Sequence, residues 1–111
     1  MEQESVVVLT TLPADGDAGA FARRLIEERL AACVNVLPAM ESFYRWEGAV
    51  EEGTERQVII KTLRARVPAL WERVCDTHPY DVPEFVVLPV IDGNAAYLAW
   101  ISDSTTPNGK T

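Results

Sequence analysis

Two short runs of apolar residues, one near each end of the chain, constrain the fold more than any other feature. The first covers residues 5–11 and is rich in valine, and the second covers residues 85–90. Runs of this length and composition, bounded by proline, glycine or aspartate, are typical of strands. Because apolar residues follow one another without polar residues between them, both faces of each strand need cover. The chain therefore has to bring packing partners to both sides of these strands.

The segments that follow each turn predict two amphipathic helices. Asp17 can cap a helix that places Phe21 and Leu25 on one side and charged residues on the other. A second helix begins near Pro68, which suits a first helical turn, and it stops at Pro79. The apolar stripe of this second helix consists of Val67, Leu70, Trp71, Val74 and Cys75.

A long β-hairpin is expected between the two helices. Its first strand covers residues 33–37 and resumes over residues 41–46 after a kink at Pro38. Glu47-Gly48 supplies the turn, and the return strand covers residues 55–62.

The complete order of elements is β-α-β-β-α-β, which predicts an α+β, ferredoxin-like sandwich in a single domain over residues 1–103. An extra C-terminal helix is expected from Ala95 to about Ser102, followed by a loose tail over residues 104–111. Right-handed crossovers place the two main helices on one face of a four-stranded sheet. The strand at residues 85–90 is then an edge, and an open apolar edge invites aggregation. We therefore expect another copy of the chain to cover it.

The acidic composition narrows the classes of partner. The chain has 10 Lys and Arg residues against 17 Asp and Glu residues, a net charge of −7. Nucleic acids and anionic membranes favour clustered basic residues, and the longest cluster here is Lys61, Arg64 and Arg66. Nucleic acid and membrane partners are therefore disfavoured. No stretch approaches the roughly 18 apolar residues of a membrane helix, and the acidic N-terminus lacks a signal pattern, so we expect a cytoplasmic protein.

Five motifs together resemble the CutA divalent-cation tolerance family. They are Leu30-Ala31-Ala32-Cys33-Val34-Asn35, Tyr44-Arg45-Trp46-Glu47-Gly48, Glu55 with Lys61-Thr62, His78-Pro79-Tyr80-Asp81-Val82-Pro83-Glu84, and Tyr97-Leu98-Ala99-Trp100. They occur in the family's order and spacing. The resemblance implies a homotrimer similar to the PII signalling proteins, with strands pairing between subunits. It also implies a role in tolerance of divalent metals, with copper binding in some members.

The same resemblance bears on metal ligands. Copper-binding members carry a Cys at the position of Thr10 and can carry a second His at the position of Thr77, so His78 alone remains of that ligand set. Cys75 lies one helical turn before His78, and the two are candidate ligands for Cu²⁺ or another divalent cation. Alternatively, His78 caps the helix and Cys75 belongs to the core. Neither Cys75 nor Cys33 is in a CxxC pair, so no structural zinc site is predicted.

A ligand cleft is expected where charged and aromatic residues follow the strands. Lys61 ends a predicted central strand, where a charge is costly unless it is paired or faces a cleft. Glu55 and Glu84 are candidate partners, and the alternative is a lysine that reaches solvent. The aromatic side chains suit subunit contacts or a small-ligand pocket. The full set of candidate cleft residues is Lys61, Tyr80, Glu84, Glu55, Tyr44 and Cys33.

Three functions are consistent with these residues and with the resemblance. The leading hypothesis is a trimeric, non-catalytic binding protein in divalent metal ion homeostasis, with copper as the first candidate and with ligand sites in the clefts between subunits. The second is a PII-like adaptor that senses a small anion through Lys61. The third is a hydrolase or transferase that uses Cys33 or His78, and it is disfavoured because no complete set of acid, base and nucleophile is readable. We expect no enzyme activity and no organic cofactor.

Overall fold

The computed structural model describes residues 4–107 as an α+β fold. In chain order its elements are β1 (Ser5–Pro13), α1 (Ala18–Glu27), β2 (Cys33–Trp46), β3 (Ala49–Leu63), the 3₁₀ helix η1 (Arg64–Arg66), α2 (Val67–Thr77), β4 (Val86–Pro89) and α3 (Ala95–Thr105). The strands form one antiparallel sheet in the order β2-β3-β1-β4. The predicted ferredoxin-like order, with an additional C-terminal helix, is confirmed.

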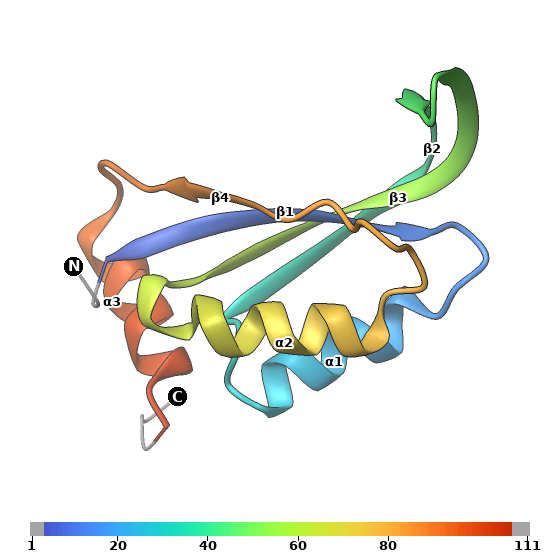
Figure 1. The fold of residues 1–111 in the computed structure, drawn as a ribbon. Helices are drawn as coiled ribbons and strands as arrows, with labels where there is room; N and C mark the ends of the chain where they lie inside the picture. Colours follow the sequence, from blue (N-terminus) through green and yellow to red (C-terminus); the bar gives the residue numbers. More distant parts are fainter. Residues whose placement is uncertain (1–3, 108–111) are drawn as a thin grey trace.

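The two main helices lie on the same face of the sheet, as right-handed crossovers require. Figure 1 shows α1 and α2 beneath the strands and α3 at the end of the sheet where β1 begins. Among residues 4–107, no helix is long and apolar enough to cross a membrane. Helices α1 and α2 thus cover one face of the sheet along its length, and α3 lies at its end.

The main core lies between the sheet and helices α1 and α2. Its fully buried side chains include Val6, Val8, Leu25, Val58, Ile60 and Leu70. Successive side chains of a strand point to opposite faces, so Val7 and Leu9 lie on the other face of β1. These two are only half-buried, because no helix of the subunit lies over them. Burial of an aliphatic side chain stabilises a fold by about 1.5–3 kcal/mol, so an uncovered face forgoes much stabilisation.

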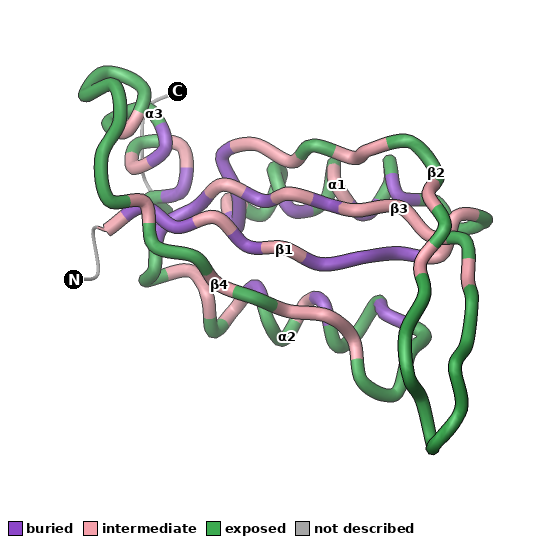
Figure 2. Tube along the Cα trace, turned by 90° about the horizontal axis from the view of Figure 1, so that it is seen from above, coloured by how far each residue is buried: buried purple, intermediate pink, exposed green. Residues whose placement is uncertain are grey.

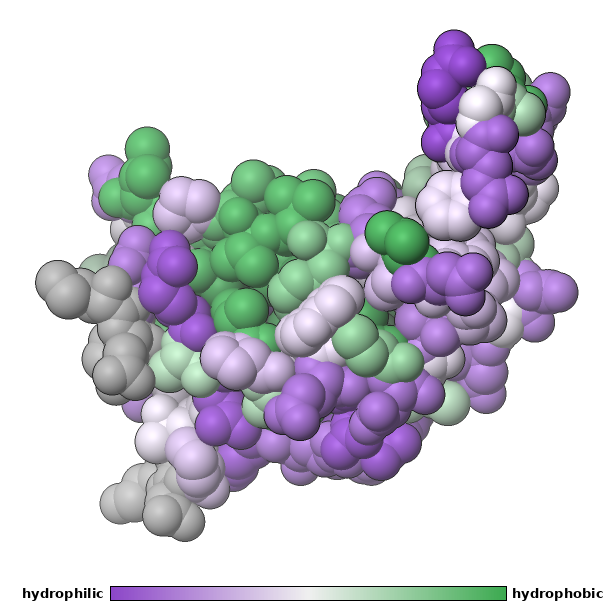
Figure 3. Space-filling view, in the orientation of Figure 1, coloured by the Kyte–Doolittle hydropathy of each residue, from purple (hydrophilic) through white to green (hydrophobic). Residues whose placement is uncertain are grey.

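The open face of the sheet carries an apolar patch that extends onto the edge strand β4. Val86 pairs with Leu9 and Leu88 pairs with Val7, so these four side chains share that face. Val86 and Leu88 are each 44% exposed. Figure 3, which shows the side of the molecule where β4 lies, has hydrophobic side chains gathered around β4 with polar side chains around them. Apolar patches with a polar rim are typical of interaction surfaces.

Strands β2 and β3 continue as a two-stranded ribbon beyond the rest of the sheet. Trp46 pairs with Ala49 across the turn residues Glu47 and Gly48, whose φ angles are 50° and 83°. Two positive φ angles are the mark of a type I′ turn, which suits the twist of a hairpin. Figure 2 shows this ribbon projecting from the molecule with exposed residues along both strands. A two-stranded ribbon without cover on either face is marginally stable by itself.

The hairpin and the edge strand differ from the prediction at their ends. A register shift between Val36 and Ala39 confirms the kink expected at Pro38, but the pairing continues without a gap to the turn. As a result β3 begins at Ala49, six residues before the predicted start. The edge strand β4 is shorter than residues 85–90 because only four of its residues pair with β1.

The last helix is longer than predicted. α3 continues to Thr105, whose buried hydroxyl donates to the carbonyl oxygen of Ile101 at 2.8 Å. The chain at residues 104 and 105 therefore belongs to the helix and not to the expected tail. Residues 108–111 of that tail lie outside the described residues.

The apolar stripe of α2 is only partly buried. Leu70 and Val74 lie in the core. Cys75 is exposed, so the expectation that it belongs to the core is wrong. Trp71 is also partly exposed and packs against Phe85 with its ring centroid 4.8 Å away.

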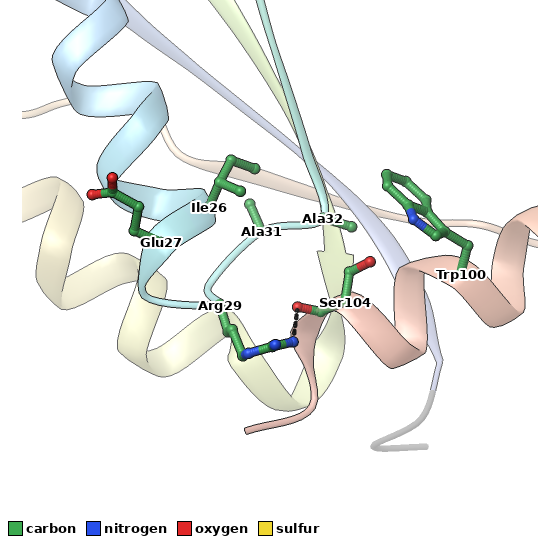
Figure 4. Close-up of a pocket in the computed structure, with 7 residues that line it drawn as sticks. All are labelled: Ile26, Glu27, Arg29, Ala31, Ala32, Trp100 and Ser104. Carbon is green, nitrogen blue, oxygen red and sulfur yellow. Dashed lines mark hydrogen bonds between the residues drawn. The ribbon is translucent and has the colours of Figure 1, made fainter. Parts of the chain in front are cut away.

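The end of α1 is fastened to the end of α3 by Arg29. This residue has a φ angle of 57°, in the left-handed region, and follows the last turn of α1. Its Nη1 donates to the carbonyl oxygen of Ser104 at 3.2 Å (Figure 4) and to that of Asp103 at 3.5 Å. A positive charge is favourable at a helix C-terminus. Arg29 therefore stabilises the packing of α3 at this end of the sheet.

Candidate functional site

The loop at residues 78–85 lies beside the second half of β1 and is attached to it by His78. The ring of His78 is buried, and its Nε2 contacts the carbonyl oxygen of Thr11. Its Nδ1 accepts a hydrogen bond from the backbone N–H of Tyr80 at 3.2 Å. Because Nδ1 accepts, Nε2 carries the proton and donates to Thr11, which is the arrangement of a neutral imidazole. The His78 backbone N–H also donates to the Val74 carbonyl at 2.8 Å, so His78 is the C-cap of α2.

Both ring nitrogens of His78 are thus engaged with backbone groups. A metal ion needs an unprotonated nitrogen with an open lone pair. Binding of a metal to His78 would have to replace one of these hydrogen bonds. The alternative reading of His78 as a helix cap agrees with this geometry.

Tyr80 reaches across β1 to β3. Its hydroxyl donates to Glu55 Oε2 at 3.2 Å, and its ring lies 4.5 Å from the ring of His78. Burial, and then the negative charge of Glu55 and the hydrogen bond to it, raise the pKa of Tyr80 above its usual range. Tyr44 also contributes to the raised pKa of Tyr80, which places it at the same end of the sheet. Tyr80 is therefore a protonated hydrogen-bond donor throughout the neutral range.

Glu84 is held by a ring of hydrogen bonds with Thr10 and Gln57. Gln57 Nε2 donates to the Thr10 carbonyl oxygen at 2.7 Å and to Glu84 Oε2 at 2.9 Å. Thr10 Oγ1 donates to the backbone carbonyl of Glu84 at 2.7 Å. Each of the three residues is therefore bonded to the other two. At the position where the resemblance predicts a cysteine in copper-binding members, this chain has a hydroxyl that is buried and already bonded.

Lys61 and Cys33 form a second group on the open face. Lys61 pairs with Cys33 on β2 and with Val7 on β1, so the three side chains are neighbours. No ion pair of Lys61 occurs within residues 4–107. At a rise of about 3.3 Å per residue, its backbone lies roughly 13 Å from Gln57 along β3. Within one subunit, the predicted cleft residues therefore fall into two separate groups.

The first group contains the carboxylates and the second contains the lysine. The carboxylate group consists of Tyr44, Glu55, Tyr80 and Glu84 from the predicted set, with Gln57, Thr10 and His78 around them. The lysine group consists of Lys61 and Cys33. Each group includes residues of β3, and these residues (Glu55, Gln57 and Lys61) lie on the same face of the sheet because they are an even number apart.

The described residues of one subunit do not form a complete metal site. Within residues 4–107, no group of three or more His, Cys, Asp and Glu side chains could hold a metal ion. Cys75 is exposed on α2, whereas the ring of His78 turns toward β1. Since a closed zinc site takes four ligands, further ligands would have to come from another chain.

No nucleophile and base come together at Cys33 either. Its thiol lies 3.7 Å from Asn35 Oδ1 on the same strand. The only histidine, His78, is bonded to Thr11 and Tyr80 instead. The hydrogen-bonded pair that activates a catalytic thiol is therefore absent from residues 4–107.

The surface of the subunit has shallow depressions away from these groups. One of about 250 Å³ lies between the end of α1 and α3 and is lined by Ile26, Glu27, Arg29, Ala31, Ala32, Trp100 and Ser104 (Figure 4). Another of about 280 Å³ lies beside Pro13, Asp15 and Pro79. Neither contains Glu55, Glu84 or Lys61.

Comparison with known proteins decides the family. Residues 6–104 match the family model described as CutA1 divalent ion tolerance protein. The chain belongs to the CutA1 family. It is 48% identical over 99 residues to the divalent-cation tolerance protein CutA of Thermus thermophilus, covering 89% of this chain and 96% of that protein. It is 46% identical to the chloroplastic CutA 1 protein of Oryza sativa, covering 91% of this chain and 57% of that longer protein.

Solved CutA1 structures have the same fold. The crystal structure of CutA1 from Oryza sativa superposes with a TM-score of 0.88 at 45% identity, covering 93% of this chain and 94% of that one. A CutA from Archaeoglobus fulgidus, described as periplasmic, has a TM-score of 0.87 at 32% identity, covering 92% of this chain and 99% of that one. The resemblance inferred from the motifs is confirmed.

Sequence reasoning missed Gln57 as part of the site. The periodicity of the strand could have found it, because Glu55, Gln57 and Lys61 alternate onto one face of β3. The role of Thr10 was missed because its hydrogen bond to Glu84 joins residues that are 74 positions apart.

Proposed function

We propose that this protein acts in divalent-cation tolerance as a non-catalytic binding protein, assembled as a homotrimer with ligand sites in the clefts between subunits. One observation carries the proposal. A carboxylate group around Glu55 and Glu84 and a lone cation, Lys61, lie on the same open and largely apolar face. Neither group is a complete ligand site by itself. The apolar side chains of this face are partly exposed to solvent in the single subunit.

Assembly supports the site because it supplies both the cover and the missing ligands. The edge strand β4 and the projecting β2–β3 ribbon leave apolar side chains in contact with solvent, including Phe43, Val50 and Leu88. Leu88 lies on the open face, where a second copy would bury it and bring its own polar groups to the rim. Phe43 and Val50 lie on the opposite face of the ribbon, where cover would need a further contact. If the edge of one subunit pairs with a different surface of the next, the contacts are head-to-tail. Such contacts can close into a ring of three subunits.

The chemistry of the carboxylate group supports a divalent cation with oxygen ligands. Carboxylate oxygens suit Mg²⁺, Ca²⁺ and Mn²⁺, whereas Cu²⁺ favours imidazole and copper(I) favours sulfur. His78 is occupied by backbone groups, and Thr10 offers no thiol. We therefore propose both Cu²⁺ and Mn²⁺ as candidate cations. In either case Glu55 and Glu84 are the ligands that one subunit would supply.

Calorimetric titration of Cu²⁺, Zn²⁺ and Mn²⁺ tests this proposal. At least one cation should bind the wild type, and Glu55→Gln and Glu84→Gln should each weaken binding at least tenfold. Glu72→Gln, an exposed carboxylate on α2, is the matched control and should bind as the wild type does. Absence of binding by the wild type, or equal loss in the control, would contradict the proposal.

The second candidate function is a PII-like adaptor that senses a small anion. It is favoured by Lys61, which pairs with Val7 and Cys33 on the neighbouring strands and makes no ion pair within residues 4–107. Thermal-shift screening of phosphate and nucleotides tests it, because a ligand of the folded state raises the melting temperature. Lys61→Met should abolish any such shift, while Arg23→Met on the exposed side of α1 should leave it unchanged.

We also propose that the protein works in the cytoplasm and is not an enzyme. Its two cysteines are free, which fits a reducing compartment. Fractionation of cells by compartment tests the location, and it matters because a relative is described as periplasmic. Turnover of ester or phosphate substrates that is lost in Cys33→Ala would contradict the non-catalytic role.

A further inference from the structure

Gln57 has a fixed orientation between β1 and the loop at residues 78–85. Its Nε2 lies 2.7 Å from the Thr10 carbonyl oxygen and 2.9 Å from Glu84 Oε2. A carbonyl and a carboxylate can only accept, so each takes one hydrogen of the Gln57 amide group. Both donor positions of the amide are therefore used, and its orientation is determined by its neighbours.

Glu84 is held in two different ways. Its backbone carbonyl accepts from Thr10 Oγ1 at 2.7 Å, and Thr10 is completely buried. Its carboxylate accepts from Gln57 through Oε2. Within residues 4–107, Oε1 of Glu84 takes part in no hydrogen bond or ion pair that would occupy it. One carboxylate oxygen is thus bonded to Gln57, and the other is left to accept from a ligand.

The bond from Gln57 is not needed to attach the loop. Thr10 already fastens the backbone at Glu84, and the contact of His78 with Thr11 fastens the start of the loop. What Gln57 adds is restriction of the Glu84 side chain. A free glutamate side chain has many rotamers, and ordering it opposes ligand binding. A donor that orders it beforehand removes that cost from the binding step.

We infer that Gln57 is a positioning residue of the ligand site, which sets the orientation of the Glu84 carboxylate before a ligand arrives. The inference rests on the proposed function, because it treats Glu84 as a ligand-contacting residue. Groups that orient a metal-ligating side chain without touching the metal typically change metal affinity by roughly ten- to a hundredfold when removed. The expected effect of losing Gln57 is therefore on affinity more than on stability.

The first test follows the Glu84 carboxylate in the ligand-free protein. The NMR resonance of the Glu84 carboxyl carbon, ¹³Cδ, is assigned by its absence from the spectrum of Glu84→Gln. In the Gln57→Leu variant, the chemical shift of this carbon should move toward that of a solvated glutamate. The melting temperature of that variant should fall by only a few degrees. In Gln57→Lys, which keeps a donor at this place, the resonance should return toward the wild-type position. An unchanged Glu84 resonance in Gln57→Leu would overturn the inference, even if that variant were less stable.

The second test measures affinity for the cation that the wild type binds most tightly among Cu²⁺, Zn²⁺ and Mn²⁺. Gln57→Leu should bind it at least tenfold more weakly, with recovery in Gln57→Lys. Equal affinity of Gln57→Leu and wild type would overturn the inference while leaving the proposed function intact. If the wild type binds none of the three, the proposed function fails, and the Glu84 resonance still decides whether Gln57 positions the carboxylate.

Discussion

Tyr80, on the loop after α2, donates its hydroxyl to Glu55 on β3 at 3.2 Å. The bond crosses β1, so it ties the loop to a strand that is not its neighbour in the sheet. It also joins two residues of the predicted cleft set. The carboxylate end of the candidate site is therefore organised within one subunit, before any partner or ligand binds.

Loss of this hydroxyl should have a small and specific cost. Tyr80→Phe removes the donor to Glu55, and a hydrogen bond of this kind contributes about 0.5–1.5 kcal/mol net. Because Tyr80 is 40% exposed, the lower half of that range is expected. Urea denaturation measures the change. Tyr97→Phe is the control, since Tyr97 is similarly exposed and its ring contact with Trp100 is kept; equal destabilisation by both changes would argue against the bond.

The raised pKa of Tyr80 predicts a dependence of stability on alkaline pH. A group with a pKa raised in the folded state holds its proton more tightly there than in the unfolded chain. Its contribution is complete below the unfolded pKa of about 10 and is lost as pH rises from there toward the folded pKa. The unfolding free energy of Tyr80→Phe should fall less steeply than that of the wild type above pH 10. If the unfolding free energies of the two proteins fell equally steeply above pH 10, the ionisation of Tyr80 would not be the cause of the pH dependence.

His78 and Cys75 should respond very differently to substitution. His78→Ala leaves the Thr11 carbonyl and the Tyr80 N–H without their partners at a buried position, which should cost roughly 2–4 kcal/mol. Cys75→Ala changes an exposed side chain and should stay within about 0.5 kcal/mol of the wild type. Denaturation of the two variants measures this. A His78→Ala variant as stable as the wild type would contradict the role of His78 in attaching the loop to β1.

The left-handed backbone conformation of Arg29 predicts which of two variants at this position is the more stable. Both Arg29→Ala and Arg29→Gly lose the hydrogen bonds to Asp103 and Ser104. Only glycine adopts a φ angle of 57° without a steric penalty of about 1–2 kcal/mol. Arg29→Gly should therefore be the more stable of the two by about 1 kcal/mol, as measured by thermal or urea unfolding. The reverse order would mean that this backbone conformation is not retained.

Much of the fold could be predicted because it depends on local patterns. The strand at residues 5–11, the cap at Asp17 and the turn at Glu47-Gly48 all follow from neighbouring residues. The early start of β3 could not be predicted in this way. Residues 49–54 contain two glutamates and a glycine, and they are strand only because the turn pairs them with β2.

The candidate site was harder to predict because it depends on register and on long-range contacts. The sequence placed Lys61 with Glu55 and Glu84 in a cleft between subunits, and within one subunit Lys61 lies apart from the two carboxylates. The ring of hydrogen bonds among Thr10, Gln57 and Glu84 joins three distant segments. Such contacts follow from which residues pair across the sheet, and a single strand pattern does not specify the pairing partner.

The apolar face offers a direct way to disturb assembly. Leu88→Lys places a charge on the edge strand β4 in the centre of the exposed patch, where a subunit contact would have to bury it. The variant should dissociate at concentrations at which the wild type remains assembled, as measured by sedimentation velocity. Glu72→Lys, on the outer side of α2, is the control and should assemble normally.

The mass of the wild-type protein in solution tests the central claim most directly. Light scattering coupled to size-exclusion chromatography at micromolar concentration should give about three times the chain mass of 12.3 kDa, with no monomer. A folded, stable species of 12.3 kDa would contradict both the assembly and the ligand sites proposed between its subunits.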